Sequence, residues 1–254
     1  MYNKTLSTII EKKVYIKMSY ITHPNDFNSI YLNLYCEDNS LFNKDTVIKK
    51  DSFGLQIKYK YDNEYINGFN FTLFENNFKW NELSTGFFET DIFTNKLKMN
   101  IILNETIFID FITILEKYLK TMLLENKNFN KYIINIKKTV TVKDSVSYFN
   151  NIKFNYFIKN NVKKIISKIY IKKKQDCNIN TVLMTEDEIE HCINTGFYIL
   201  PIISLKTLYI KKQNKTLNVF PHFYLYSVTL YNKYKHDLND SILDKKCNID
   251  EEGY

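Results

Sequence analysis

Lysine and aromatic side chains alternate in two segments of this sequence. The first is Lys58-Tyr59-Lys60-Tyr61, with Phe78-Lys79-Trp80 beyond it. The second spans residues 197–231, where lysines dominate the first half and aromatic rings the second. Ammonium groups can follow the phosphates of a single nucleic-acid strand while its bases stack on ring faces. The candidate phosphate contacts are Lys58, Lys60, Lys206, Lys211, Lys212 and Lys215, and the candidate stacking rings are Trp80, Tyr209, Phe223, Tyr224 and Tyr226.

Aromatic residues on strands also pack in cores, so each ring has a structural alternative. Tyr59 and Tyr61 share the strand face of Leu55 and Ile57, which predicts that they face the core and that Lys58 and Lys60 are exposed. Pro221 predicts a bulge or an edge position, where the alternation changes phase.

The usual nucleotide and acyl-transfer motifs are absent. The five glycines lie far apart and cannot form a Walker A loop or a G-x-G-x-x-G turn, and there is no G-x-S-x-G sequence. We therefore predict no cofactor and no enzymatic activity.

A metal site is also not expected. Cys177, His191 and Cys192, with His222 or His236, lack the ligand spacing that zinc sites show. We predict no metal ligands.

A weak alternative is a Mg²⁺-dependent nuclease. Asp110 with Glu125-x-Lys127 resembles an acidic-plus-E-x-K arrangement, although all three positions fit the surface of one helix.

The elements that position these residues are mainly strands. Alternation predicts strands near 10–35, at 53–61, at 69–74, at 132–142, at 152–158, and in a long hairpin of 197–211 and 216–231 joined by Gln213-Asn214-Lys215. Asn67-Gly68 indicates a turn. Residues 161–174 fit either a helix or a strand. No linker or internal repeat divides the chain.

Two helices are expected. Apolar residues at i, i+3 and i+4 predict an amphipathic helix over 105–125, with Asn104 as its N-cap and Glu105 in its first turn. A capping box starting at Thr185 predicts a short helix that Gly196 ends.

Composition limits what these patterns mean. All 35 basic residues are lysines and the net charge is +7, which suits nucleic acid or another acidic partner. Codons for the dominant residues are AT-rich, so genome bias alone could produce the lysines. Without arginine, readout of guanine is weak and binding should depend on charge and stacking. Scattered cysteines, an N-terminus interrupted by lysines, and charges within Ile101–Leu124 predict a soluble intracellular protein without a membrane span.

From residue 105 onward, the order is a long helix, strands, an acidic helix, then Leu200-Pro201-Ile202-Ile203-Ser204-Leu205-Lys206-Thr207-Leu208-Tyr209-Ile210, a turn, a strand and an acidic end. This order resembles the single-stranded-DNA-binding proteins of large DNA viruses, the poxvirus type most of all and the baculovirus type next. The poxvirus type has a longer acidic tail, and residues 1–90 match no family.

The resemblance implies an α+β, mainly β fold with an OB-like barrel or antiparallel sheet. We expect one domain over 1–236 and a flexible acidic tail over 237–254. The implied function is to coat single-stranded DNA, or RNA, during viral replication, recombination or repair, at the replication site in the nucleus or the cytoplasm. Self-association on DNA is expected, and Asp250, Glu251 and Glu252 would recruit replication proteins or compete for the site.

The main rival is a non-enzymatic structural or assembly protein of an AT-rich virus. It predicts lysines spread around the fold, whereas nucleic-acid binding predicts lysines gathered along one surface.

Overall fold

The computed structural model describes residues 24–33, 48, 50–61, 63–72, 84–91, 96–103, 106–159, 162–175 and 178–232. Within these ranges the chain is mainly β, as predicted. The helical elements are η1 (Pro24–Ser29), α2 (Thr106–Glu125) and α3 (Glu186–His191). The strands are β1 (Ile30–Asn33), β2 (Ser52–Tyr61), β3 (Glu64–Asn67), β4 (Phe69–Thr72), β5 (Thr85–Asp91), β6 (Lys96–Leu103), β7 (Ile133–Ile136), β8 (Val140–Lys143), β9 (Val146–Phe154), β10 (Tyr156–Lys159), β11 (Val162–Ile165), β12 (Lys168–Gln175), β13 (Asn178–Leu183), β14 (Gly196–Gln213) and β15 (Thr216–Asn232).

Thirteen of the described strands form one sheet, and β10 and β11 form a separate pair. The main path of the sheet runs β1-β2-β14-β5-β6-β9-β15-β12-β13. Strand β15 pairs in parallel with β7, β9 and β12, whereas the other pairs are antiparallel. The sheet is therefore mixed, and the expected antiparallel sheet is found only in part, because most but not all of the strand pairs are antiparallel.

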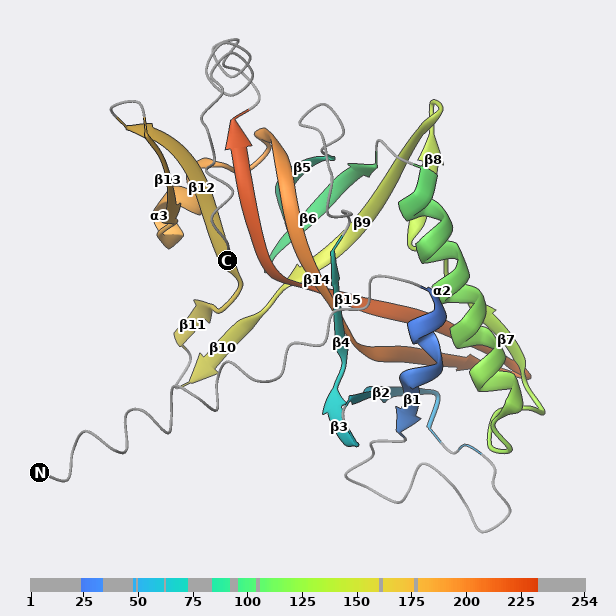
Figure 1. Cartoon of the computed structure of the whole chain (residues 1–254). Coiled ribbons are helices and arrows are strands. Elements are labelled where there is room, and N and C mark those ends of the chain that lie inside the picture. The colour runs from blue at the N-terminus through green and yellow to red at the C-terminus, as the bar shows by residue number, and fades with distance from the viewer. Residues whose placement is uncertain are drawn as a thin grey trace, which may run out of the picture.

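The long hairpin β14–β15 lies at the centre of the sheet, where both strands bend strongly (Figure 1). Gln213 pairs with Thr216 across a two-residue turn, and Asn214 adopts φ 54°, a conformation that asparagine tolerates. The predicted hairpin is confirmed.

Two bulges interrupt this hairpin. The register leaves Lys206 without a partner on β14 and Tyr226 without one on β15. Pro221 marks neither bulge, because it pairs with Leu208 and the buried positions continue every second residue on both sides of it. The predicted bulge and change of phase at Pro221 were therefore wrong, whereas the predicted edge position is found on one side of β15, where neither β7 nor β9 pairs with Pro221.

Helix α2 supplies the apolar layer on one side of the sheet. It contacts η1, β6, β7 and β8 (Figure 1), and its stripe of Ile112, Leu115, Leu119 and Leu123 is fully buried. Its Phe111 ring meets the Phe27 ring of η1 edge-on, 5.3 Å between centroids. The predicted helix is confirmed, while its proposed cap at 104 and 105 lies outside the described residues.

Helix α3 begins at the predicted capping box. The Glu188 amide donates to the Thr185 hydroxyl, and the Thr185 amide donates to the Glu188 carboxylate. The helix ends at His191, and Gly196 instead begins β14. The prediction that Gly196 ends the helix was therefore wrong. Residues 162–165 and 168–175, left undecided between helix and strand, are strands.

Gly68 turns the chain from β3, which pairs with β2, into β4, which pairs with β14. Its φ is 73°, and its amide donates to the Ile57 carbonyl, 2.7 Å away. A Cβ at this position would lie 2.7 Å from the Leu205 backbone oxygen. The turn predicted at Asn67-Gly68 thus needs glycine for both its backbone conformation and its close approach.

We expect Gly68→Ala to lower the free energy of unfolding by about 1–3 kcal/mol, because a strained φ and a backbone clash both act on the folded state. Urea denaturation monitored by circular dichroism measures the change. The matched control is Gly54→Ala, where an added Cβ meets no atom within 4 Å. Equal stability of the two variants would contradict this account of the turn.

Several predicted features lie outside the described residues. They are the strand around 14–18, the segment Phe78-Lys79-Trp80, Cys177, His236, and the tail 237–254 with Asp250, Glu251 and Glu252. Within the part of the chain that is described, no helix is both long enough and apolar enough to cross a bilayer.

Candidate nucleic-acid interface

The hairpin β14–β15 presents one face to the core and the opposite face to solvent. Leu208 and Ile210 of β14 and Leu217 and Val219 of β15 are fully buried on the core side. The register places Tyr209 beside Phe220 and Thr207 beside His222 on the other side. We call this solvent side of β2, β14, β15 and β7 the outer face.

Three rings gather at the centre of the outer face. The Tyr209 and His222 rings are parallel, 9° between planes and 5.8 Å between centroids, and Phe220 lies 6.1 Å from Tyr209. On the other side of Tyr209 the paired residue is Gly54, whose Cβ position is open space. Tyr209 is 38% exposed, so its ring is accessible for stacking.

Several predicted lysines surround these rings. Alternation along β2 puts Lys58 and Lys60 on the same side as Gly54, and Lys60 is exposed. Lys211 pairs with Ser52, two positions from Tyr209, and is also exposed. The structure therefore brings these three predicted lysines to one face with Tyr209. The prediction that Tyr59 faces the core with Leu55 and Ile57 is confirmed, while the side chain of Tyr61 lies outside the described part of the chain.

Lys206 and Tyr224 form a second contact on this face. The Lys206 ammonium lies 5.9 Å from the centre of the Tyr224 ring. Burial lowers the pKa of Lys206 from its usual 10.5. The bulge releases Lys206 from the pairing of β14 and lets its stem cover the ring.

Two predicted contacts lie on the wrong side of the sheet. Phe223 is 3% exposed and meets the Phe149 ring edge-on, 4.9 Å between centroids. The Lys212 ammonium donates to the Ile48 carbonyl at 2.7 Å and lies 3.9 Å from the Asp51 carboxylate. Both residues are inward on their strands, so neither can serve the outer face as predicted.

The remaining predicted residues are dispersed. Lys215 is exposed in the hairpin turn, and Tyr226 is half-buried in the second bulge. Trp80 lies outside the described residues.

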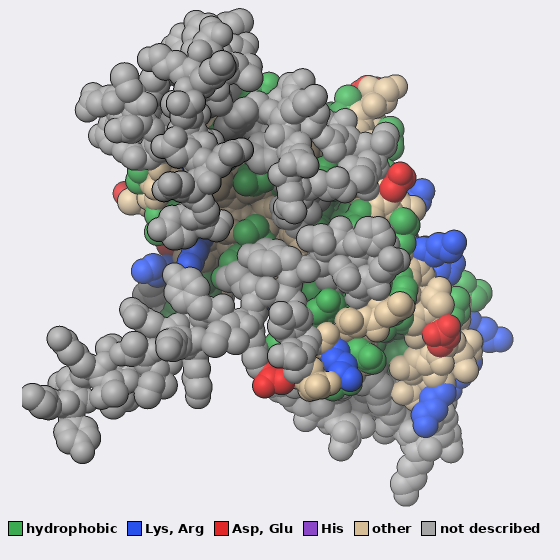
Figure 2. All heavy atoms as spheres, in the orientation of Figure 1, with side chains coloured by type: hydrophobic (Ala, Val, Ile, Leu, Met, Phe, Trp, Pro, Cys, Tyr) green, Lys and Arg blue, Asp and Glu red, His purple; other side chains and the backbone are tan. Residues whose placement is uncertain are grey.

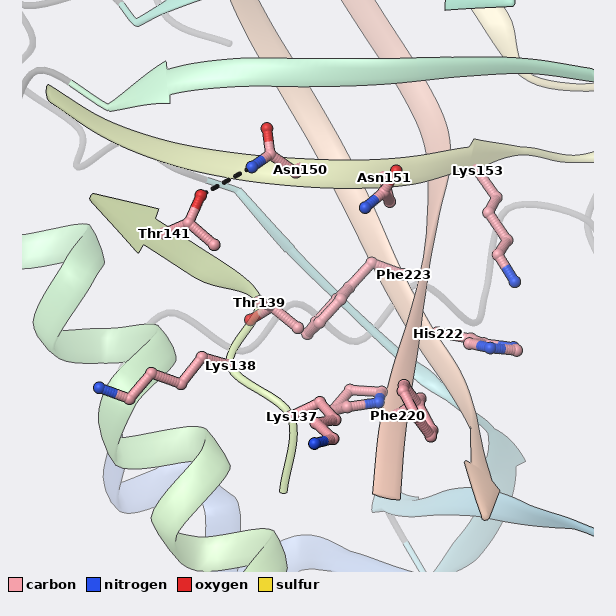
Figure 3. A pocket seen from close by; sticks show the side chains of 11 residues that line it. Lys137, Lys138, Thr139, Thr141, Asn150, Asn151, Lys153, Phe220, His222 and Phe223 are labelled. Atoms are coloured by element: carbon pink, nitrogen blue, oxygen red, sulfur yellow. Dashed lines mark hydrogen bonds between the residues drawn. The ribbon is translucent and has the colours of Figure 1, made fainter. Parts of the chain in front are cut away.

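A hollow of about 250 Å³ opens beside the rings, next to β15 (Figure 3). Its lining combines lysines, amides and hydroxyls with the Phe220, Pro221, His222 and Phe223 side of β15. In Figure 3 the Lys153 side chain points toward His222, and Lys137 lies beside Phe220, whereas Lys138 points away toward α2. The lining residues include no carboxylate: Lys137, Lys138, Thr139, Thr141, Asn150, Asn151, Lys153, Phe220, Pro221, His222 and Phe223.

His222 is neutral at physiological pH. Burial, and secondarily the charge of Lys153, lowers its pKa from 6.5 to about 4. Burial also lowers the pKa of Lys153, with Lys96 acting in the same direction and Asp91 opposing it. A neutral imidazole can accept or donate a hydrogen bond and can stack without repelling the nearby lysine.

We expect an NMR titration to give His222 a midpoint near pH 4. The folded chain then binds fewer protons than the unfolded chain between about pH 6.5 and 4, so stability falls as the pH falls through that window. Lys153→Gln should raise this midpoint, because it removes the positive charge that helps to lower the pKa of His222. A midpoint near 6.5 in the unaltered chain would contradict the buried position of the ring.

Lys137 and Lys153 were not predicted from the sequence, and Phe220 and His222 were not among the predicted stacking rings. Period-two alternation from Tyr224 already places the two rings on one face. No local pattern could find the two lysines, because long-range parallel pairing of β7 and β9 with β15 brings them there.

The residues that the structure describes bring together no metal-binding site of the kind that a nuclease or a zinc protein would need. Asp110 and Glu125 lie fifteen residues apart on α2, which separates them by about 22 Å along the axis. Among the described residues, no three histidine, cysteine or acidic side chains gather as metal ligands would.

Lysines are not confined to the outer face. Figure 2 shows them also along the edge of the molecule where α2 lies, and Lys117 and Lys120 of α2 are exposed. The outer face therefore differs from the α2 side by its accessible rings and its hollow, and not by lysine number alone.

No family model matches the chain. The sequence is similar to the DNA-directed RNA polymerase subunit beta of Theileria parva, with 28% identity over 165 residues. The similar region covers 63% of this chain and 15% of that subunit. This chain therefore spans a small part of the length of its relative.

Proposed function

We propose that the outer face binds single-stranded nucleic acid without sequence preference and without catalysis. The main support for this proposal is the cluster of the Tyr209, Phe220 and His222 rings on the solvent side of the strands. Lys58, Lys60 and Lys211 flank this cluster. Lysines would hold phosphates and the rings would stack on bases.

The biological setting is proposed from the sequence resemblance. Coating of single-stranded DNA in viral replication, recombination or repair suits a lysine-basic chain that lacks arginine. The OB-type barrel and the acidic tail as a partner site remain predictions. The relative is a subunit of a DNA-directed RNA polymerase, which supports a nucleic-acid role in general terms.

The testing experiment is a titration of intrinsic fluorescence with oligo-dT at several salt concentrations. About six phosphate contacts would give a slope of roughly −4 for log affinity against log salt. Quenching should accompany binding because tyrosines stack on the bases.

Duplex DNA of equal length is the control, because it cannot offer unstacked bases to the rings. Quenching by oligo-dT alone, with the expected salt slope, supports the proposal. A flat salt dependence, or no response to either nucleic acid at low salt, overturns it and favours the structural or assembly protein.

A second candidate is a region of an RNA polymerase subunit, favoured by the similarity to the Theileria parva protein. It predicts that the chain co-purifies with other polymerase subunits from its own source. Co-purification that survives high salt and nuclease treatment would favour this candidate over free coating of a strand.

A further inference from the structure

The hollow beside the rings lies where one edge of β15 is unpaired over a short stretch, while its other edge pairs with β14. Strand β7 pairs with residues 216–219, and β9 pairs with Tyr224 and Leu225. Neither strand pairs with residues 220–223, and these four line the hollow. The gap is therefore built into the sheet.

Pro221 fits this gap in the sheet. The Val219 carbonyl accepts from the Lys137 amide at 2.8 Å, so Val219 directs its backbone groups toward β7. By alternation, the nitrogen of Pro221 points to the same edge, where no strand could accept a hydrogen bond. Proline leaves no unpaired N–H there, so the opening carries no unsatisfied donor at this position.

The walls of the hollow are held in place. Thr139 donates twice to the Glu116 carboxylate of α2, at 2.7 Å from its amide and 2.6 Å from its hydroxyl. Opposite, Asn151 has φ 61°, and its amide donates to Asn100 Oδ1 at 2.9 Å. The segments that carry Lys137 and Lys153 are thus positioned before any ligand arrives.

The charges of the hollow suit one anion. Lys137 and Lys153 border it without a carboxylate in the lining, and no described residue forms an ion pair with either ammonium. In Figure 3 the rings of Phe220 and His222 lie between the two lysines, and both residues line the hollow. Cations and rings that line one hollow meet the two requirements of a nucleotide, because the lysines can hold its phosphate and the rings can contact its base.

We propose that this hollow holds a single nucleotide of the bound strand, with its phosphate on Lys137 and Lys153 and its base against Phe220 and His222. The inference rests on the proposed function and names the part of the ligand that enters this subsite. The hollow of about 250 Å³ is smaller than the pockets of about 300–1,000 Å³ that enclose drug-sized ligands, so we assign to it one nucleotide and not a longer stretch of the strand.

The test follows the ring resonances of His222 during titration with dTMP, inorganic phosphate, thymidine and oligo-dT. Replacing His222 identifies its resonances among those of the four histidines. We expect saturable shifts with dTMP and oligo-dT, and much weaker ones with phosphate or thymidine at equal concentration. Lys137→Ala with Lys153→Ala should weaken dTMP binding at least about tenfold and reduce the salt slope for oligo-dT by about 1.4.

The matched control is Lys117→Ala with Lys120→Ala, which removes the same charge from exposed positions of α2. Equal loss of dTMP binding in both double variants would overturn the subsite. Equal shifts with phosphate and dTMP would also overturn it, because only an anion would then be recognised.

The two proposals fail in different ways. Oligo-dT binding that keeps its affinity and salt slope in the Lys137→Ala with Lys153→Ala variant overturns the subsite, and it leaves Tyr209 with Lys58, Lys60 and Lys211 as the binding surface. Saturable dTMP binding without any binding of oligo-dT supports a nucleotide site and overturns the coating function.

Discussion

Phe223→Ala is expected to lower the free energy of unfolding by about 3–5 kcal/mol, the usual range for deleting a buried phenyl ring. The ring is 3% exposed and is held edge-on between Phe149, 4.9 Å away, and Phe71, 6.0 Å away. Alanine would leave a cavity between the hairpin, β9 and β4, and would remove both aromatic contacts. Urea denaturation at pH 7 measures the loss.

The matched variant is Phe220→Ala, three residues earlier on the same strand and on the outer face. We expect it to cost less than about 1.5 kcal/mol of stability, because its half-exposed ring leaves no closed cavity. It should instead weaken oligo-dT binding, by about 1–3 kcal/mol if one base stacks on it. If Phe223→Ala left the stability unchanged, the buried position of Phe223 would be contradicted, and the sequence prediction that its ring stacks on a base would stand again.

Removing Lys58, Lys60 and Lys211 together, each as alanine, is expected to weaken oligo-dT binding on the order of 10–100-fold at low salt. Three phosphate contacts would be lost, so the salt slope should fall from about −4 to about −2. These side chains lie on the outer face, and Lys60 and Lys211 are exposed, so the fold should tolerate the change. Fluorescence titration at several salt concentrations gives both quantities.

The control variant replaces Lys117, Lys120 and Lys127, which are exposed on or just after α2, on the opposite side of the sheet. It has the same net charge as the outer-face variant. If both variants lose affinity equally, binding depends on overall charge and the outer face is not a specific surface.

Local patterns in the sequence predicted the elements well. The stripe of α2, the alternation of β2, the capping box at Thr185 and the hairpin after Gly196 each depend on residues close in the chain. Such patterns are governed by backbone period and local hydrogen bonds, which a sequence displays directly.

The site could be predicted only in part. Tyr209 and Lys60 lie exposed on the outer face, as the sequence predicts, whereas the predicted contacts Phe223 and Lys212 point inward. Phe223 is next to the predicted contact Tyr224, and Lys212 is next to Lys211, so period-two alternation can place only one residue of each pair on the outer face. The bulges at Lys206 and Tyr226 have no marker in the sequence. The hollow depends on where β7 and β9 stop along β15, which only long-range pairing determines.

The central hairpin also determines when the chain can fold. Strands β2, β4 and β5 pair with β14, and β7, β9 and β12 pair with β15, yet both hairpin strands follow all of them in the sequence. During synthesis, the earlier strands therefore lack their β14 and β15 partners, and their edges stay unpaired until residue 232 has left the ribosome. Such non-local pairing slows folding to milliseconds or seconds and exposes strand edges to neighbouring chains. Ribosome pausing before residue 196 would thus favour aggregation, and a holdase chaperone would protect this chain most at that stage.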